Sequence, residues 1–123
     1  MVIKTTLTAK GNYNATLKPA LKLFKGDIVY VEITLFYSLI SSINGVEVED
    51  NIPMNELKDV KLKLLTPNGT ETFDSIEIVD NRARFKIQAN EELGDYPFMV
   101  VCYDNDGCVF HLPKVMYTIA DTL

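Results

Sequence analysis

The stretch that decides the fold runs from Leu62 to Tyr103 and reads LKLLTPNGTETFDSIEIVDNRARFKIQANEELGDYPFMVVCY. It passes from strand to turn to strand three times. The breaks are a Pro-Asn-Gly turn at residues 67–69, an Asp-Asn turn at residues 80–81 and a Gly-Asp-Tyr entry at residues 94–96. Between them, apolar and polar residues alternate, as in strands that bury one face. This stretch predicts an all-β protein.

Further strands are expected on both sides. The longest covers Ile28 to Leu39, where alternation places residues 29, 31, 33, 35 and 37 on a core face. Asn44-Gly45 favours a tight hairpin between Ile40 and Val48, and residues 41–58 as a whole are expected to form an exposed excursion. Residues 16–25 and 88–93 are each expected to hold a helical turn. The other expected strands are Val2–Thr8, Val60–Leu64, Thr70–Phe73, Ile76–Ile78, Ala83–Ile87, Tyr96–Tyr103, Cys108–Leu112 and Val115–Ile119.

Size and composition fit one domain over residues 1–123, with 47% hydrophobic and 24% charged residues. Short strands at regular spacing and the absence of a long helical pattern predict an immunoglobulin-like antiparallel β-sandwich of about seven to nine strands. The Cys and Trp signature of antibody domains is missing, because the chain has no Trp. Only the general architecture is therefore expected to be shared.

The charge of the chain argues against nucleic acid and membranes as partners. The formal net charge is −5, and Lys and Arg form no cluster. The longest apolar segment, Ile28 to Ile40, is interrupted by Glu32 and Thr34 and is too short to span a bilayer. The first ten residues lack the pattern of a secretory signal, so synthesis inside the cell is expected.

Two motifs suggest metal or nucleophile chemistry, and neither is complete. Asp104-Asn-Asp-Gly107 resembles the opening of a calcium loop, but Val115 stands where the bidentate Glu is required, so a turn with left-handed Gly107 is favoured. His111 follows Cys108 by three residues, which on a strand places the two side chains on opposite faces. No metal site and no cysteine–histidine dyad is predicted.

The two cysteines leave two alternatives open. Cys102 and Cys108 flank a short turn, so a cross-strand disulfide is geometrically conceivable. Two free thiols are favoured, because a cytosolic protein rarely keeps a disulfide.

The 17 carboxylates form no acid/base pair that the sequence reveals, and phosphate loops and nucleophile elbows are missing. The chain is therefore predicted not to be an enzyme, to have no catalytic residues and to need no cofactor.

Both faces of two long strands are apolar, which predicts a protein interface. Residues 96–103 carry apolar side chains on each side, and so do residues 28–36. If both strands share a sheet, its outside presents one apolar patch, which is more surface than a soluble domain usually exposes. Alternatively, residues 9–25 or 40–58 of the chain itself cover this face. The expected interface residues are Tyr30, Phe36, Met99, Val101 and Tyr103.

The order of several motifs resembles the immunoglobulin-like modules of tailed-phage virions, especially the N-terminal domain of baseplate upper proteins. The motifs are Lys25-Gly-Asp27 before a long strand, residues 57–69 (LKDVKLKLLTPNG), Ala83-Arg-Phe85, Gly94-Asp-Tyr96 and Tyr103-Asp-Asn-Asp-Gly107, which together span about two-thirds of the chain. The chain departs from that pattern by ending at Leu123 and by its acidic 41–58 excursion. A free-standing module looks more like a capsid decoration, a head-fibre component or a tail adaptor.

The resemblance implies a non-enzymatic structural protein of a virion, made in the bacterial cytoplasm. It would dock through its apolar sheet face to itself, in several copies, or to a capsid, fibre or tail protein. The alternative is a carbohydrate-binding or adhesive module, in which Tyr13, Tyr30, Tyr37 and Tyr103 would take the place of the missing Trp. A hydrolase whose carboxylates meet only in space is a third possibility.

Overall fold

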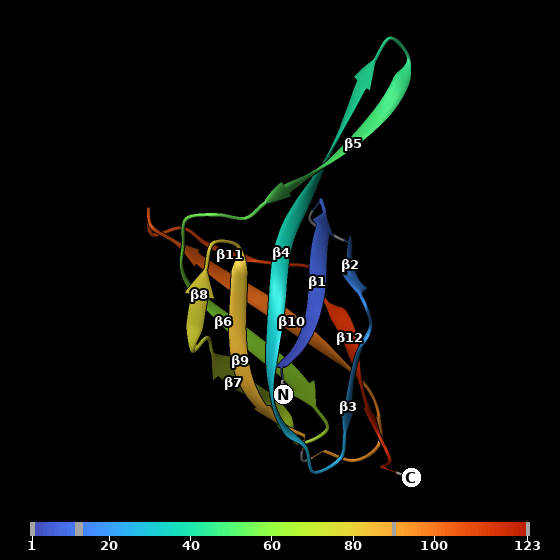
Figure 1. The fold of residues 1–123 in the computed structure, drawn as a ribbon, viewed down its shortest axis with the longest axis vertical. Helices are drawn as coiled ribbons and strands as arrows, with labels where there is room; N and C mark the ends of the chain where they lie inside the picture. The colour runs from blue at the N-terminus through green and yellow to red at the C-terminus, as the bar shows by residue number, and fades with distance from the viewer. Residues whose placement is uncertain (1, 12–13, 90, 123) are drawn as a thin grey trace.

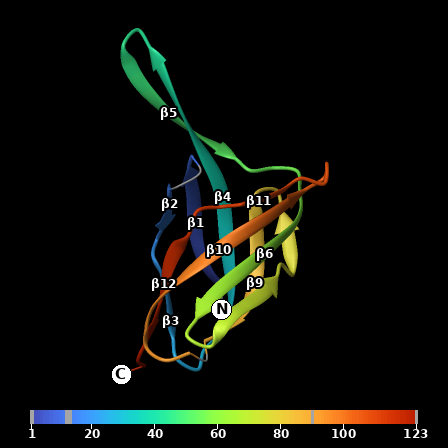
Figure 2. The same ribbon diagram turned by 180° about the vertical axis from the view of Figure 1, so that it is seen from behind.

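The computed structural model of the chain describes residues 2–11, 14–89 and 91–122. Within these residues every regular element is a β-strand, and there are twelve. They form two sheets of six strands, packed face to face as a sandwich. Figure 1 shows the first sheet towards the viewer, and Figure 2 shows the second sheet from the opposite side.

The first sheet is built around one long strand. Its order is β2 (Asn14–Lys18), β1 (Val2–Lys10), β4 (Ile28–Ile43), β9 (Arg82–Gln88) and β8 (Glu77–Val79). The far half of β4 leaves this sheet and pairs with β5 (Val46–Pro53). Because β4 has 16 residues, it is long enough to serve both as a central sandwich strand and as half of a projecting hairpin.

The second sheet has the order β3 (Leu21–Phe24), β12 (Val115–Ala120), β10 (Gly94–Asp104), β6 (Leu57–Thr66) and β7 (Gly69–Asp74). The short strand β11 (Val109–His111) pairs with the end of β10. Alternation along β10 turns Phe98 and Val100 inward and Met99 outward, as expected from the sequence.

The core lies between the sheets and is filled by alternating apolar side chains. Phe85, Phe98 and Tyr117 are its largest members, and the rings of Phe98 and Tyr117 meet edge to face at 5.9 Å between centroids. From β4, Val31 and Ile33 are fully buried in it. Burial of this kind is the main force that holds two sheets together.

The predicted all-β sandwich is confirmed, with two differences in detail. The structure has twelve strands where about seven to nine were expected. β2 and β3 form where a connector and a helical turn were expected, and β5 continues the expected hairpin to Pro53. Two pairs, β1 with β4 and β3 with β12, are parallel, so both sheets are mixed and not purely antiparallel.

The helical turn expected in residues 16–25 is wrong. Leu17 and Leu21 are four residues apart, which imitates a helical spacing. In the structure Leu17 lies in β2 of the first sheet, and Leu21 and Leu23 lie in β3 of the second. The chain therefore crosses between the layers as two strands. Thr5 Oγ1 donates a hydrogen bond of 2.6 Å to the Pro19 carbonyl at this crossing. Of the helical turn expected at 88–93, residue 90 lies outside the described residues, and its described neighbours are not helical.

The hairpin of β4 and β5 stands clear of the sandwich at one end, in both views (Figures 1 and 2). Its strands pair from Phe36 and Pro53 to Ile43 and Val46, so the hairpin predicted between Ile40 and Val48 is confirmed and is longer than expected. The rest of the 41–58 excursion, expected as a loop, is largely strand. We call residues 37–52 the arm.

Candidate functional site

The tip of the arm is a two-residue turn. Asn44 and Gly45 have φ values of 52° and 76°, and positive φ at both central positions defines the turn that suits the twist of a β-hairpin. Asn tolerates this left-handed region and Gly has no Cβ to oppose it. The Asn-Gly pair therefore fixes the register of all the rungs below it.

The two faces of the arm differ in chemistry. Residues directly paired across an antiparallel ladder point to the same side, so each rung belongs to one face. One face, which we call the apolar face, carries alternate rungs and holds two polar residues, Ser41 and Asp50. Its rungs are Tyr37 with Ile52, Leu39 with Asp50, Ser41 with Val48, and Ile43 with Val46.

The apolar face is open to solvent. Leu39 is 52% exposed, Ile43 59% and Val46 63%, and all three lie on the same face of the arm. A two-stranded hairpin is marginally stable alone in water, because it lacks a second layer on which to bury its side chains. The arm thus presents apolar surface that the rest of the described chain does not cover.

The opposite face of the arm is mixed, with Ile40 exposed among Ser38, Ser42, Glu47 and Glu49, and it is tied to the sandwich. Ser38 Oγ donates a 2.7 Å hydrogen bond to Glu49 Oε1, and Lys10 Nζ lies 3.3 Å from the same oxygen. The Ser38 hydrogen bond, and then Lys10, hold the pKa of the Glu49 carboxyl below its usual value. Because Lys10 ends β1, this contact links the arm to the body on its charged side.

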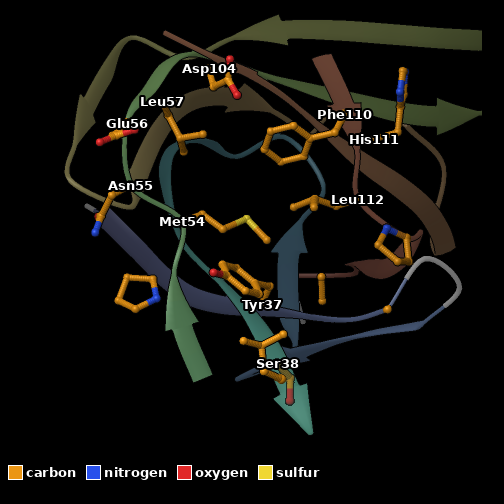
Figure 3. A pocket seen from close by; sticks show the side chains of 15 residues that line it. Tyr37, Ser38, Met54, Asn55, Glu56, Leu57, Asp104, Phe110, His111 and Leu112 are labelled. Atoms are coloured by element: carbon orange, nitrogen blue, oxygen red, sulfur yellow. The ribbon is translucent and has the colours of Figure 1, made fainter. Parts of the chain in front are cut away.

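A cleft of about 590 Å³ opens at the base of the arm, between the two sheets. We call it the foot cleft. Figure 3 shows Tyr37 and Met54 converging on it from the arm side and Phe110 and Leu112 from the second sheet. Met54 and Leu112 are almost fully buried, while Tyr37 is 38% exposed. The floor is therefore apolar and partly accessible.

Polar groups surround this floor. Glu56, Asp104 and His111 lie at the edge of the cleft. The Asp104 carboxylate is already used, since its Oδ1 accepts hydrogen bonds of 2.9 Å from the backbone N–H groups of Asp106 and Cys108. Gly107 has a φ of 84°, so residues 104–107 form the left-handed turn that the sequence favoured over a calcium loop.

Among the described residues, no three His, Cys, Asp or Glu side chains lie close enough together to hold a metal ion. Likewise, across residues 2–11, 14–89 and 91–122, no helix is long and apolar enough to cross a membrane.

The five expected interface residues do not form one patch. The premise that their strands share a sheet is wrong, because β4 lies in the first sheet and β10 in the second. Tyr30 and Phe36 therefore lie on the outside of one layer and Met99 and Tyr103 on the outside of the other. Alternation along a strand shows which of its side chains face outward. It does not show which strand, distant in the sequence, pairs with it.

On the second sheet, Val101 is only 1% exposed and so has no surface to offer a partner. It lies between Lys61 and His111 in the sheet register. Lys61 Nζ also lies 5.7 Å from the centre of the Tyr103 ring. Neighbouring strands of the same chain thus cover much of this apolar row, and Met99 and Tyr103 are half-buried.

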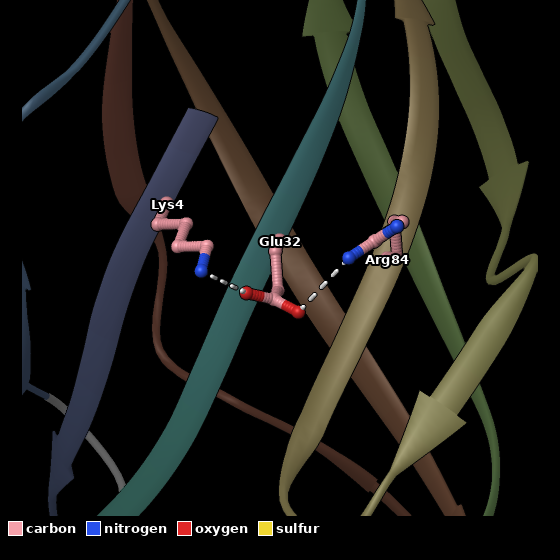
Figure 4. Close-up of polar contacts among 3 residues, drawn as sticks. All are labelled: Lys4, Glu32 and Arg84. Carbon is pink, nitrogen blue, oxygen red and sulfur yellow. Dashed lines mark hydrogen bonds and ion pairs between the residues drawn. The ribbon is translucent and has the colours of Figure 1, made fainter. Parts of the chain in front are cut away.

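On the first sheet, a row of charges separates Tyr30 from Phe36. Glu32 lies between them on β4, 8% exposed, with Lys4 Nζ at 3.9 Å and Arg84 Nη2 at 3.5 Å from its two oxygens (Figure 4). Because these contacts are long and Lys4 is well exposed, they add little stability. Their main effect is to make the middle of this face polar. A contact role for Tyr30, 38% exposed, or for Phe36 stays a prediction.

Both cysteines are free. Cys102 points into the core beside Phe110, and burial raises its pKa to about 12. Cys108 is exposed in the turn before β11. The two-thiol alternative is the one that the structure bears out.

Sequence reasoning missed the arm as a site. Part of the signal was present, because Val46 and Val48 alternate with Glu47 and Glu49 after the Asn-Gly turn, whereas Leu39-Ile-Ser-Ser-Ile43 before it does not alternate. Their polar neighbours and the acidic residues 47, 49 and 50 made the segment look like a solvated loop. No family model, curated protein or solved structure matches this chain. The arm and the foot cleft are the features from which its function is inferred.

Proposed function

We propose that this protein is a non-enzymatic structural or assembly protein, and that it docks through its arm. The resemblance of its motifs to tailed-phage modules makes a virion the proposed particle, with the chain as a capsid decoration, head-fibre component or tail adaptor. The observation that carries the proposal is the exposed apolar face of the arm. Assembly proteins of large particles commonly use such surfaces, because a permanent contact can bury them for good.

The arm replaces the flat sheet face as the docking element. The outer faces of both sheets carry charges among their apolar residues, as Lys61 and Glu32 show. On the apolar face of the arm, by contrast, Asp50 is the only charged residue among the paired positions. Depletion of charge in the centre of a contact is the usual mark of an interface.

The proposal predicts that Ile43→Ser with Val46→Ser removes the protein from its particle. Both side chains are more than half exposed, so the variant keeps its fold while losing the apolar tip. Particles from the native source are separated on a density gradient, and the tagged chain is detected in each fraction. Wild-type chain is expected with the particles, and the variant at the top of the gradient.

Met116→Ser is the matched control, because Met116 is 53% exposed on the outside of the second sheet, away from the arm. It is expected to migrate with the particles. Equal incorporation of the tip variant, or a wild-type chain that never joins a particle, would contradict the proposal.

The second candidate, a carbohydrate-binding module, is favoured by one feature of the foot cleft. Tyr37 and Phe110 lie there beside the polar groups of Asn55 and Glu56, and sugar rings stack on aromatic faces flanked by polar groups. A glycan array separates the candidates. A specific signal that Tyr37→Ala abolishes would support sugar binding, and a blank array would support the assembly role.

A further inference from the structure

The apolar face of the arm and the floor of the foot cleft form one continuous surface. Tyr37 belongs to both, since it is the lowest rung of the arm's apolar face and also lines the cleft. Leu39, one rung further out, lines the cleft as well. The surface therefore runs from Phe110 and Leu112 at the foot, shown in Figure 3, to the rung of Ile43 at the tip.

The arm cannot fill its own cleft. Tyr37 and Ile43 are six residues apart on one straight strand, which at about 3.3 Å per residue places the tip roughly 20 Å from the foot. The tip also points away from the sandwich (Figure 2). The arm therefore leaves both the cleft and its own apolar face open to another occupant.

A surface of this shape is complementary to itself. A two-fold rotation about the middle of the arm, between the rung of Leu39 and the rung of Val48, exchanges tip and foot. Two copies related in this way would lay apolar face on apolar face with their arms antiparallel. Each contact would then occur twice, which is the property of an isologous interface.

Building on the proposed assembly role, we propose that the occupant is a second copy of this chain. The arms of two copies pack face to face as a small two-layered sandwich, and the Ile43–Val46 tip of each lies over the foot cleft of the other. The arm supplies the layer that its partner's arm lacks.

The available area fits such a dimer. Tyr37, Leu39, Ile43, Val46 and Val48 leave between 37% and 63% of their surfaces exposed. Over two copies this amounts to on the order of 1,000 Å², which is near the lower limit for a specific interface. The dimer is therefore expected to be weak in solution.

The uncharged tip fits this arrangement, while Asp50, the one charged residue among the paired positions of the apolar face, has to keep its carboxylate at the hydrated rim of the interface. The tip, residues 43–46, carries no charge, so it can enter the apolar cleft without losing hydration of an ion. Glu47 and Glu49 belong to the rungs of the opposite face and stay in water. The Asn44 amide is an N–H donor suited to the Glu56 carboxylate at the partner's cleft edge.

Sedimentation of the purified chain tests the proposal. Over a concentration series up to about 1 mM, where weak complexes still form, the wild-type mass is expected to rise from one chain to two. Ile43→Ser with Val46→Ser should remain a single chain, and Met116→Ser should follow the wild type. Added salt should leave the association unchanged or strengthen it, because the arms are both acidic. A wild-type chain that stays monomeric throughout would overturn the proposal.

Disulfide capture tests the tip-to-foot geometry. In a Cys108→Ser background, Asn44→Cys with Asn55→Cys should give a reducible dimer on mild oxidation, because Asn55 lines the cleft over which the partner's tip lies. Asn44→Cys alone is the control, since the two tips are far apart in this dimer. Efficient cross-linking of the control would overturn the antiparallel arrangement.

The failure of this proposal is distinguishable from the failure of the assembly role. If the wild-type chain is monomeric in sedimentation and the tip variant is absent from the particles, self-pairing is refuted and the assembly role stands. If the wild-type chain dimerises and the tip variant is still found with the particles, docking to the particle through the arm is refuted and self-pairing stands.

Discussion

Tyr117 places a hydroxyl inside the core, and the consequence is electrostatic. Among the described residues, its oxygen has no hydrogen-bond partner. Burial, with smaller contributions from the charges of Glu91, Tyr96 and Glu71, raises the pKa of Tyr117 to about 12. Burial alone raises the pKa of the Cys102 thiol to about 12 as well. Both groups are thus held protonated in the folded chain at pH values where an unfolded chain begins to release them.

The fold is therefore predicted to lose stability in alkali. Above about pH 9 the unfolded chain loses the Cys102 proton while the folded chain keeps it, so the free energy of unfolding falls as pH rises. Tyr117 adds to the fall above about pH 10. Urea midpoints measured from pH 7 to 11 give the profile.

Tyr117→Phe provides the comparison for that profile. It should flatten the fall above pH 10 and change stability at pH 7 by no more than about 1 kcal/mol, because it removes a hydroxyl that forms no bond to other described residues. A wild-type midpoint that stays constant up to pH 11 would contradict the assignment.

At the scale of the element, β4 combines two roles that its sequence distinguishes. From Val29 to Leu35 every odd-numbered residue is buried, as in a central strand, and beyond Tyr37 both of its faces are largely open. The change occurs where β1 ends at Lys10 and β5 becomes the only neighbour. The geometry of the arm then depends on its turn.

Gly45→Ala is predicted to loosen the arm and leave the sandwich intact. A Cβ at Gly45 meets no atom within 4 Å, so the cost comes from the φ of 76° and is about 1 kcal/mol. Amide hydrogen exchange in residues 39–50 should then be roughly fivefold faster, with exchange in β10 unchanged. Gly45→Asn is the control, since Asn tolerates this conformation, and it should stay near the wild-type rates.

Exchange that does not change in the Ala variant would mean that the arm is held by something other than its turn.

At the scale of the whole molecule, local patterns predicted the layers and missed their assembly. The turns at residues 67–69, 80–81 and 105–107 correctly marked the hairpins and strand ends, because turn chemistry is local. The parallel pairing of β1 with β4 joins segments about 28 residues apart in register, which no local pattern encodes. The placement of β4 and β10 in different sheets was missed for the same reason, and with it the shape of the candidate site.

The body is predicted to fold without its arm. Replacing residues 38–51 by Asn-Gly joins Tyr37 and Ile52, a pair of the same type as Ile43 and Val46, through a two-residue turn. None of the removed residues belongs to the core, and the loss of Glu49 removes only exposed polar contacts. Thermal unfolding should stay cooperative, with a midpoint within a few degrees of wild type. Aggregation, or loss of the cooperative transition, would show that the arm is needed to form the body.

The unbroken course of β4 from the centre of the first sheet to the arm has a mechanical consequence. A pull on the tip acts along the strand axis and loads the ladders to β1 and β9 in shear, on both sides of β4. In shear the hydrogen bonds of a ladder resist together, whereas peeling breaks them one after another. A force applied at the tip by a bound neighbour would therefore be shared between both ladders.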